Sequence, residues 1–154
     1  MPLLPPILRA VLVWLLIVVA ETLQGGLRRL LFDPQVEFIV RQVSVLTGAV
    51  VIFAITWTCI RWLKIGSSAG ALGVGLLWVV LTLGFEVLIG RALGLSWARI
   101  AADYDLLHGG LMPVGLLAMA LTPWSVRQLN ARRDRDLRRR LASATSAGAR
   151  RPTP

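Results

Sequence analysis

Two glutamates stand in segments that are otherwise apolar, and they are the first candidates for chemistry. Glu21 interrupts an apolar run over residues 10–27, and Glu86 directly follows an uncharged run over residues 65–85. A charged side chain inside a bilayer costs at least about 2.5–3.5 kcal/mol, so a carboxyl group kept there is by default a functional-site hypothesis. Two carboxyl groups that face each other can share one proton, which would suit proton or cation exchange.

An arginine follows each glutamate, which permits a structural interpretation of the same residues. Arg28 comes after Glu21 and Arg91 comes after Glu86. If both glutamates lie near the outer headgroups, each arginine can neutralise its glutamate and fix the register of the helices. The two alternatives are therefore a structural ion pair, which is favoured, and transport chemistry.

A second group of polar residues, Asp103, Asp105 and His108, forms the pattern D-Y-D-x-x-H with Tyr104. Carboxylates and imidazole are metal-ligand types, so these three are candidate metal ligands. Aspartate at the start of a helix is also ordinary capping chemistry, and a capped helix entrance is the favoured alternative. A single histidine excludes bis-histidine haem ligation. No serine or cysteine has a recognisable catalytic partner. No cofactor and no enzymatic activity are therefore predicted.

The composition of the chain indicates what solvent surrounds these residues. Of the 154 residues, 56% are hydrophobic and only 16% are charged, and the mean hydropathy is +0.69. A typical soluble domain is about 25% charged. With Cys59 as the only cysteine, a disulfide-stapled secreted domain is excluded along with a soluble enzyme and a disordered chain. The expected solvent is a lipid bilayer.

Four apolar segments are long enough to cross a bilayer, at residues 7–24, 43–63, 69–90 and 107–122. Their backbone polar groups must be satisfied internally, so the segments are predicted to be helices. The expected fold is an all-α polytopic membrane protein with four transmembrane helices in residues 1–124. The first segment also resembles a signal peptide cleaved after Ala20. An uncleaved span is favoured, because one arginine and three prolines make a poor signal-peptide start.

The distribution of lysine and arginine predicts the orientation. One side of the four spans holds twelve cationic residues, namely Arg9, Arg61, Lys64 and nine arginines in residues 125–154. The other side holds five, namely Arg28, Arg29, Arg41, Arg91 and Arg99. Since cytoplasmic loops carry the excess of positive charge, both termini are expected in the cytoplasm. In the outer loops, residues 35–42 and 98–104 predict short interfacial helices, with the first turns of the following spans as the alternative.

A weak internal repeat links the two halves of the chain. An offset of 65 residues places Glu21 on Glu86 and Gly25 on Gly90, and a small shift in the loop places Arg41 on His108 and Gly48 on Gly115. These matches predict a duplicated helical hairpin, with chance similarity as the alternative. Arg41 and His108 therefore join the intramembrane ionisable candidates Glu21, Glu86, Arg28 and Arg91.

Residues 125–154 form a basic cytoplasmic tail that is predicted to be partly disordered, from residue 143 onward. Arginines close to a membrane attract anionic lipids by about 1 kcal/mol each. The candidate lipid-contacting residues are Arg132, Arg133, Arg135, Arg138, Arg139 and Arg140. Nucleic-acid binding is not predicted, because the tail contains no aromatic residue.

Residues 7–122 contain a set of spaced residues, namely Gly26-Leu27-Arg28, Pro34, Glu86, Gly90-Arg91, Ser96-Trp97-Ala98, Tyr104 and the glycines at 109, 110 and 115. On these residues the chain resembles a group of small four-helix bacterial inner-membrane proteins with no assigned reaction. The resemblance implies a topology and a location in the bacterial inner membrane. Ala20-Glu21 is also similar to the first span of small multidrug-resistance transporters, although the charge asymmetry and long outer loops here differ from that family.

The sequence thus predicts a non-catalytic accessory or interaction protein of the membrane. A homo-oligomer or a membrane-protein partner is expected, together with anionic lipids at the cytoplasmic face. The alternative is a small proton-coupled transporter that uses Glu21 and Glu86.

Overall fold

The computed structural model describes residues 4–31 and 37–149, and every regular element in that part of the chain is helical. For residues 28–29, 37–42 and 144–149 it describes the backbone only. The elements in chain order are α1 (Pro6–Leu31), α2 (Glu37–Leu63), α3 (Ser68–Ala92), α4 (Trp97–Ala102), the 3-10 helix η2 (Leu106–His108) and α5 (Met112–Ala149). The predicted all-α class is confirmed.

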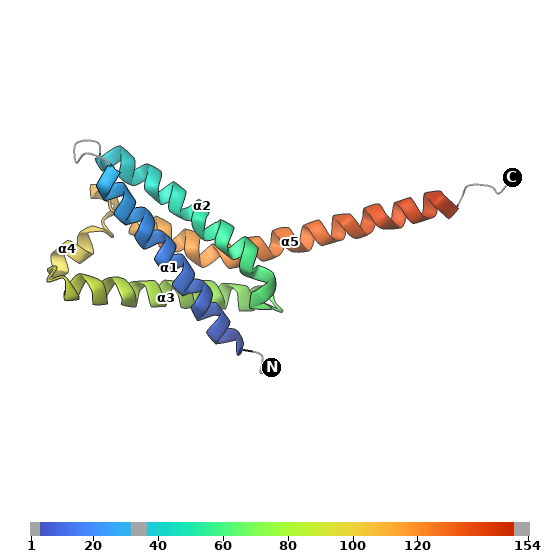
Figure 1. The fold of residues 1–154 in the computed structure, drawn as a ribbon, viewed down its shortest axis with the longest axis horizontal. Helices are drawn as coiled ribbons and strands as arrows, with labels where there is room; N and C mark the ends of the chain where they lie inside the picture. Colours follow the sequence, from blue (N-terminus) through green and yellow to red (C-terminus); the bar gives the residue numbers. More distant parts are fainter. Residues whose placement is uncertain (1–3, 32–36, 150–154) are drawn as a thin grey trace.

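The four long helices pack as an up-and-down bundle (Figure 1). Helices α1 and α3 run in one direction, and α2 and α5 run back alongside them. Both termini therefore lie toward the same end, while α4 and η2 lie at the opposite end, which we call the α4 end. Beyond the bundle, α5 continues as a single helix that projects away from the other elements.

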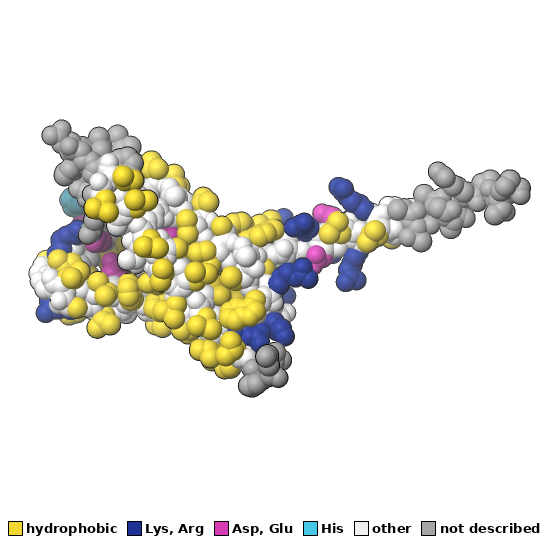
Figure 2. Space-filling view, viewed as in Figure 1, with side chains coloured by type: hydrophobic (Ala, Val, Ile, Leu, Met, Phe, Trp, Pro, Cys, Tyr) yellow, Lys and Arg dark blue, Asp and Glu magenta, His cyan; other side chains and the backbone are white. Residues whose placement is uncertain are grey.

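Three helices are long and apolar enough to cross a membrane. Their apolar stretches are Pro6–Leu27, Val43–Leu63 and Ser68–Ala92, with mean hydropathies of 2.1, 2.2 and 2.3. Leucine and valine side chains cover much of the outer surface of the bundle (Figure 2). Such continuous apolar surface is unfavourable in water, so these helices indicate a membrane protein.

The fourth predicted span differs from the structure at its start. Residues 106–108 form η2, and Gly109 has a left-handed φ of +84°, so α5 begins only at Met112. The apolar part of α5 reaches Val126, one residue before Arg127, which gives about 22 Å of helix at about 1.5 Å per residue. This length is below the roughly 30 Å of a typical hydrocarbon core, and α5 is not among the three helices above.

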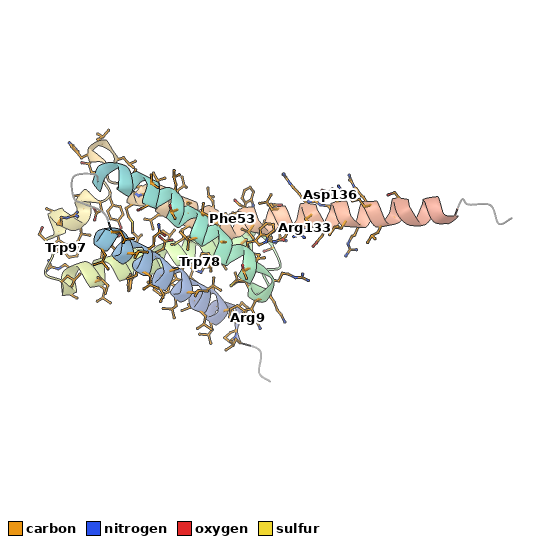
Figure 3. The ribbon with its side chains drawn as sticks, turned by 45° about the horizontal axis from the view of Figure 1, so that its top comes forward. Arg9, Phe53, Trp78, Trp97, Arg133 and Asp136 are labelled. Carbon is orange, nitrogen blue, oxygen red and sulfur yellow. The ribbon has the colours of Figure 1, made fainter. Side chains whose placement is uncertain are left out.

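Two tryptophans join α1 to α3 inside the bundle. The Nε1–H of Trp78, whose side chain is 0% exposed, donates to the Ala10 carbonyl at 2.8 Å. The Nε1–H of Trp14 donates to Thr82 Oγ1 at 3.0 Å. Trp78 lies between the helices in Figure 3. Since an unpaired buried N–H is costly, these two bonds help to fix the register of the two helices.

Helices α3 and α5 approach each other at Gly75, which is buried. A Cβ atom built on Gly75 would lie 2.0 Å from the Ala120 carbonyl oxygen, so only glycine allows this contact. Small residues at such a contact let two helix backbones approach closely inside a bilayer.

The predictions for the loops and the tail have mixed outcomes. The interfacial helix predicted at residues 98–104 corresponds to α4, which Ser96 caps by accepting a hydrogen bond from the Arg99 N–H at 3.2 Å. At residues 37–42, by contrast, the chain forms the first turns of α2, and residues 35–36 lie outside the described part. The tail was predicted to be partly disordered from residue 143 onward, but α5 is continuous from Met112 to Ala149, and residues 150–154 lie outside the described part.

Candidate functional site

Two adjoining cavities lie toward the α4 end of the bundle, with volumes of about 380 and 410 Å³. Figure 2 shows acidic side chains in a hollow at this end. Side chains from α1, α3, α4 and α5 line both cavities, and α2 lines the first one only. The two cavities share a wall that consists of Glu21, Thr82, Asp103, Met112 and Met119.

Glu21 reaches this wall from α1 and lies against a glycine of α2. A Cβ atom on Gly48 would lie 2.7 Å from Glu21 Oε2, so the absence of a side chain there makes room for the carboxylate. The second oxygen, Oε1, is buried and has no hydrogen-bond partner among the described residues. A buried acceptor without a donor is costly, so this oxygen is suited to receive a donor from a ligand or a proton.

Gln24 lies one turn after Glu21 and lines the first cavity. Its Nε2 donates to the Ser44 carbonyl at 3.1 Å, which orients the amide. Its Oε1 is a second buried acceptor that lacks a partner in the described part of the chain. The cavity therefore presents two unsatisfied oxygen acceptors on consecutive turns of α1.

Glu86 enters the second cavity from α3 and accepts a hydrogen bond from the Tyr104 hydroxyl. The ion pair between Glu86 and Arg91 that the sequence favoured does not form. Arg91 instead donates to the Leu95 carbonyl at 2.9 Å, and its guanidinium lies 5.2 Å from the centroid of the Trp97 ring. Five residues correspond to about 140° around a helix, so Arg91 points away from Glu86. The Arg28 side chain, the proposed partner of Glu21, lies outside the described residues.

Asp103, the residue directly after α4, supplies the third carboxylate and forms an ion pair with Arg99 at 3.0 Å. Both side chains line the first cavity. The helix is held in place by Ile100, which packs so closely on Gly90 that a Cβ there would lie 2.9 Å from Ile100 Cδ1. Burial, followed by the hydrogen bond to Glu86 and the charges of Glu86 and Asp103, raises the pKa of Tyr104. The phenol therefore stays protonated and remains a donor to Glu86.

The electrostatic balance of the cavities is negative. Three carboxyl groups line them, from Glu21, Glu86 and Asp103, and Arg99 is the one cationic side chain among the described lining residues. Most other lining residues are apolar, including Phe85 and Leu116. Apolar walls lower the local dielectric and strengthen the attraction of the carboxylates for a cation.

Next to the cavities, polar contacts link three helices inside the apolar bundle. Thr82 Oγ1, which accepts from Trp14, also contacts Met119 Sδ at 3.4 Å. Trp14 packs edge-on against Phe85 with ring centroids 6.2 Å apart. These contacts join α1, α3 and α5 at Thr82 and Met119, which line both cavities together with Glu21 and Asp103.

The candidate metal ligands are not brought together. His108 Nδ1 and Asp105 Oδ2 lie 2.6 Å apart on the surface, where the His108 side chain is 82% exposed. Asp103 faces Arg99 and the cavity instead. Within residues 4–31 and 37–149, no group of three or more His, Cys, Asp or Glu side chains could hold a metal ion. Asp105 caps η2 by accepting from the Leu107 N–H at 3.0 Å, whereas the capping alternative had placed such a cap at the start of the fourth span, which begins at Met112.

The remaining candidates lie away from the cavities. The Arg41 side chain lies outside the described residues. The tail arginines Arg132, Arg133, Arg135, Arg138, Arg139 and Arg140 are exposed on the projecting part of α5. Sequence reasoning missed Gln24, Thr82, Arg99 and the bond between Tyr104 and Glu86. The spacing of Glu21 to Gln24 and of Arg99 to Asp103 places each pair on one helix face, which is a signal that was available.

No family model, curated protein or solved structure matches the chain. Function is therefore inferred from the chemistry of the residues themselves.

Proposed function

We propose that the chain is a four-span membrane protein that binds a small organic cation in the acidic cavities and exchanges it for a proton. The single observation that carries the proposal is the gathering of three carboxyl groups, from α1, α3 and the end of α4, around two adjoining cavities with one described cationic side chain. This is the transporter alternative of the sequence prediction. It gains support because Glu86 does not pair with Arg91.

The volumes of the cavities and their apolar walls define the class of ligand. Ligand pockets for small molecules measure about 300–1,000 Å³ and are mostly apolar with a few polar groups. A hydrated metal ion would leave the apolar lining unused, and no described cluster fits a metal. An amine or another organic cation would place its charge near Glu21 and its apolar groups near Phe85 and Met119.

The proposed roles of the carboxyl groups differ. Glu21 Oε1 has no donor among the described residues, so Glu21 is the group proposed to exchange a proton for the cation. Glu86 is held by Tyr104 and is proposed to shape the second cavity. Asp103 pairs with Arg99 and is proposed to hold α4 over the cavities.

The fourth span is proposed to be the first part of α5. Residues 112–126 pack along α3 and α2 over the length of the bundle, and both termini lie toward the same end (Figure 1). Arg9, Arg61, Lys64 and Arg127 lie at that end, where the positive-inside rule places the cytoplasm. A bacterial inner membrane is proposed from the resemblance described above, and anionic lipids are proposed to meet this end.

The duplicated hairpin also remains a proposal. The parallel course of α1 and α3 supports it, because the repeat places Glu21 on Glu86 and both line the second cavity. The connections differ, since only the second hairpin carries α4 and η2 among the described elements.

A non-catalytic accessory role is the second candidate function. The projecting part of α5 favours it, because a long exposed helix with many arginines offers a surface for another molecule. The two roles are compatible, since they use opposite ends of the bundle.

The test of the cavity uses the purified full chain in lipid nanodiscs and tetraphenylphosphonium as the probe. Wild-type protein is expected to bind the probe and to release protons into a weakly buffered solution. Glu21→Gln keeps the size of the side chain and removes the charge, so the affinity is expected to fall about tenfold or more, since interactions with charged groups contribute about 1.5–3 kcal/mol.

Asp105→Asn is the matched control, because this carboxylate lies at the same end but outside the cavities. Its affinity for the probe should equal that of the wild type. Equal affinity in Glu21→Gln, with circular dichroism confirming the folded state, would exclude the proposed site. Wild-type protein that does not bind the probe at all would exclude the ligand class.

A further inference from the structure

The projecting part of α5, residues 129–149, is a surface that the cavity does not explain. We call it the α5 extension. It starts three residues after Val126, the last buried side chain among the described residues of α5, and it carries Arg132, Arg133, Arg135, Arg138, Arg139 and Arg140 against Asp134 and Asp136. In Figure 3, Arg133 and Asp136 project from it on a part of the helix that no other element covers.

The root of the extension is fixed to the bundle. Arg127 donates through Nη1 to Ser68 Oγ at 2.9 Å and through Nη2 to the Gly66 carbonyl at 3.0 Å, both at the turn between α2 and α3. Gln128 Nε2 also donates to Ser68 Oγ at 3.4 Å. These contacts hold the direction of α5 as it leaves the bundle, and the helix continues without a break to Ala149.

This fixed direction determines which arginines can reach lipid. At about 1.5 Å per residue, Arg138 and Arg140 lie about 16–20 Å beyond Arg127. The headgroup region is only about 5–8 Å thick on each side of a bilayer. Charges separated by more than about 8 Å are largely screened at physiological ionic strength. Arg132 and Arg133 therefore remain close to the membrane surface, whereas Arg138, Arg139 and Arg140 face the aqueous phase.

The chemistry of the outer part favours one kind of partner. Leu129, Leu137 and Leu141 lie within about a third of the helix circumference, Leu137 is 50% exposed, and Arg133 and Arg140 lie among them. A helix face that combines leucines with arginines complements a protein helix whose face combines apolar side chains with carboxylates. Nucleic acid fits less well, because residues 125–154 contain no aromatic side chain for stacking and Asp134 and Asp136 repel phosphates.

We propose that the α5 extension is a docking helix for an acidic, amphipathic segment of another protein, which binds at the cytoplasmic side of the membrane. The inference rests on the proposed fourth span and is independent of the cavity. A second copy of this chain fits less well as the occupant, since two extensions with the same excess of arginine repel each other.

The test uses the full chain in its own membrane, with the photoreactive residue p-benzoylphenylalanine in place of Leu137. A protein adduct is expected, and mass spectrometry should map it to a peptide with net negative charge. Raising the salt concentration from 0.1 to 0.5 M before irradiation should lower its yield several-fold. The matched control carries the same photoreactive residue in place of Arg135, which lies about 160° away around the helix, and should give a several-fold lower yield.

Charge variants made with the probe at position 137 complete the test. Replacing Arg138, Arg139 and Arg140 together by Gln should abolish the adduct, while replacing them together by Lys should retain most of it. A nuclease-sensitive adduct, an adduct with a second copy, or no adduct would overturn the proposed partner. An adduct with lipid alone would show that the extension lies on the membrane surface. This would contradict the assumption that α5 continues straight from the proposed fourth span into the aqueous phase.

Discussion

The two ends of the bundle carry their charges in opposite ways. At the α4 end, Glu21, Glu86 and Asp103 turn inward and share cavities, so few groups produce a strong local field. At the other end, the arginines of the α5 extension turn outward into solvent, where each contributes little on its own. The comparison shows that the local electric field near these groups depends more on their burial than on their number.

Helix α5 connects the two ends, and breaking its close contact with α3 at Gly75 gives the largest expected effect. Helix α5 lines the cavities with Met112 and Met119 and then becomes the extension, and Gly75 of α3 holds it in place. Gly75→Ala puts a methyl group 2.0 Å from the Ala120 carbonyl oxygen, so the backbones must separate. Overpacking costs about 1–3 kcal/mol, and we expect the upper part of that range in the free energy of unfolding measured in micelles.

Gly73→Ala is the matched control, because a Cβ atom on Gly73 meets nothing within 4 Å. Alanine is a better helix former than glycine by up to about 1 kcal/mol, so this variant should be as stable as the wild type or more stable. Equal destabilisation by both substitutions would mean that the α3–α5 contact does not hold the bundle together.

The apolar helices and α4 were predictable from sequence because their causes are local. Uncharged runs of about 20 residues predicted α2 and α3, and an apolar run interrupted only by Glu21 predicted α1. The mixture of apolar and charged side chains in residues 98–104 predicted α4. The start of α5 was placed five residues too early, at residue 107. Hydropathy alone does not register the left-handed turn at Gly109, where the helical hydrogen bonding is interrupted.

The site was only partly predictable, because its geometry depends on packing between distant segments. Glu21 and Glu86 were found as charges in apolar runs. The prediction that Arg91 pairs with Glu86 was wrong, and helical periodicity alone already places Arg91 on another face of α3. Tyr104 reaches Glu86 only because Ile100 packs on Gly90 and turns α4 back over α3, and no pattern in the sequence encodes that contact.

The single tyrosine gives a direct measurement of the field at the α4 end. Burial, the hydrogen bond to Glu86 and the nearby carboxylates raise the pKa of Tyr104 above its ordinary value of 10.0. Absorbance at 295 nm should therefore show no tyrosinate at pH 10 and should begin to rise only at more alkaline pH. Glu86→Gln removes one charge, so the midpoint should move back toward 10, but burial should keep it above that value.

Arg91→Gln is the control for this titration, since Arg91 contacts Leu95 and Trp97 rather than the carboxylates. It should leave the midpoint of Tyr104 close to that of the wild type. A wild-type midpoint at 10 would mean that Tyr104 is solvated and that the cavity is open to water at this point. The carboxylates at the α4 end would then be as accessible to water as the arginines of the α5 extension, and the two ends would no longer differ in burial.

The smallest effect on stability and on probe binding is expected for substitutions in the α5 extension. The comparison of the two ends requires this, because the arginines of the extension are exposed. Replacing Arg138, Arg139 and Arg140 together by Gln removes three exposed charges that form no ion pair among the described residues. Exposed substitutions usually change stability by less than about 0.5 kcal/mol, so unfolding in micelles should match the wild type. Binding of tetraphenylphosphonium should also be unchanged, because these residues lie more than a Debye length from the cavities. A triple variant with lower stability or weaker probe binding would mean that the extension is a structural part of the bundle. Its arginines would then interact with the protein's own carboxylates rather than with those of a partner.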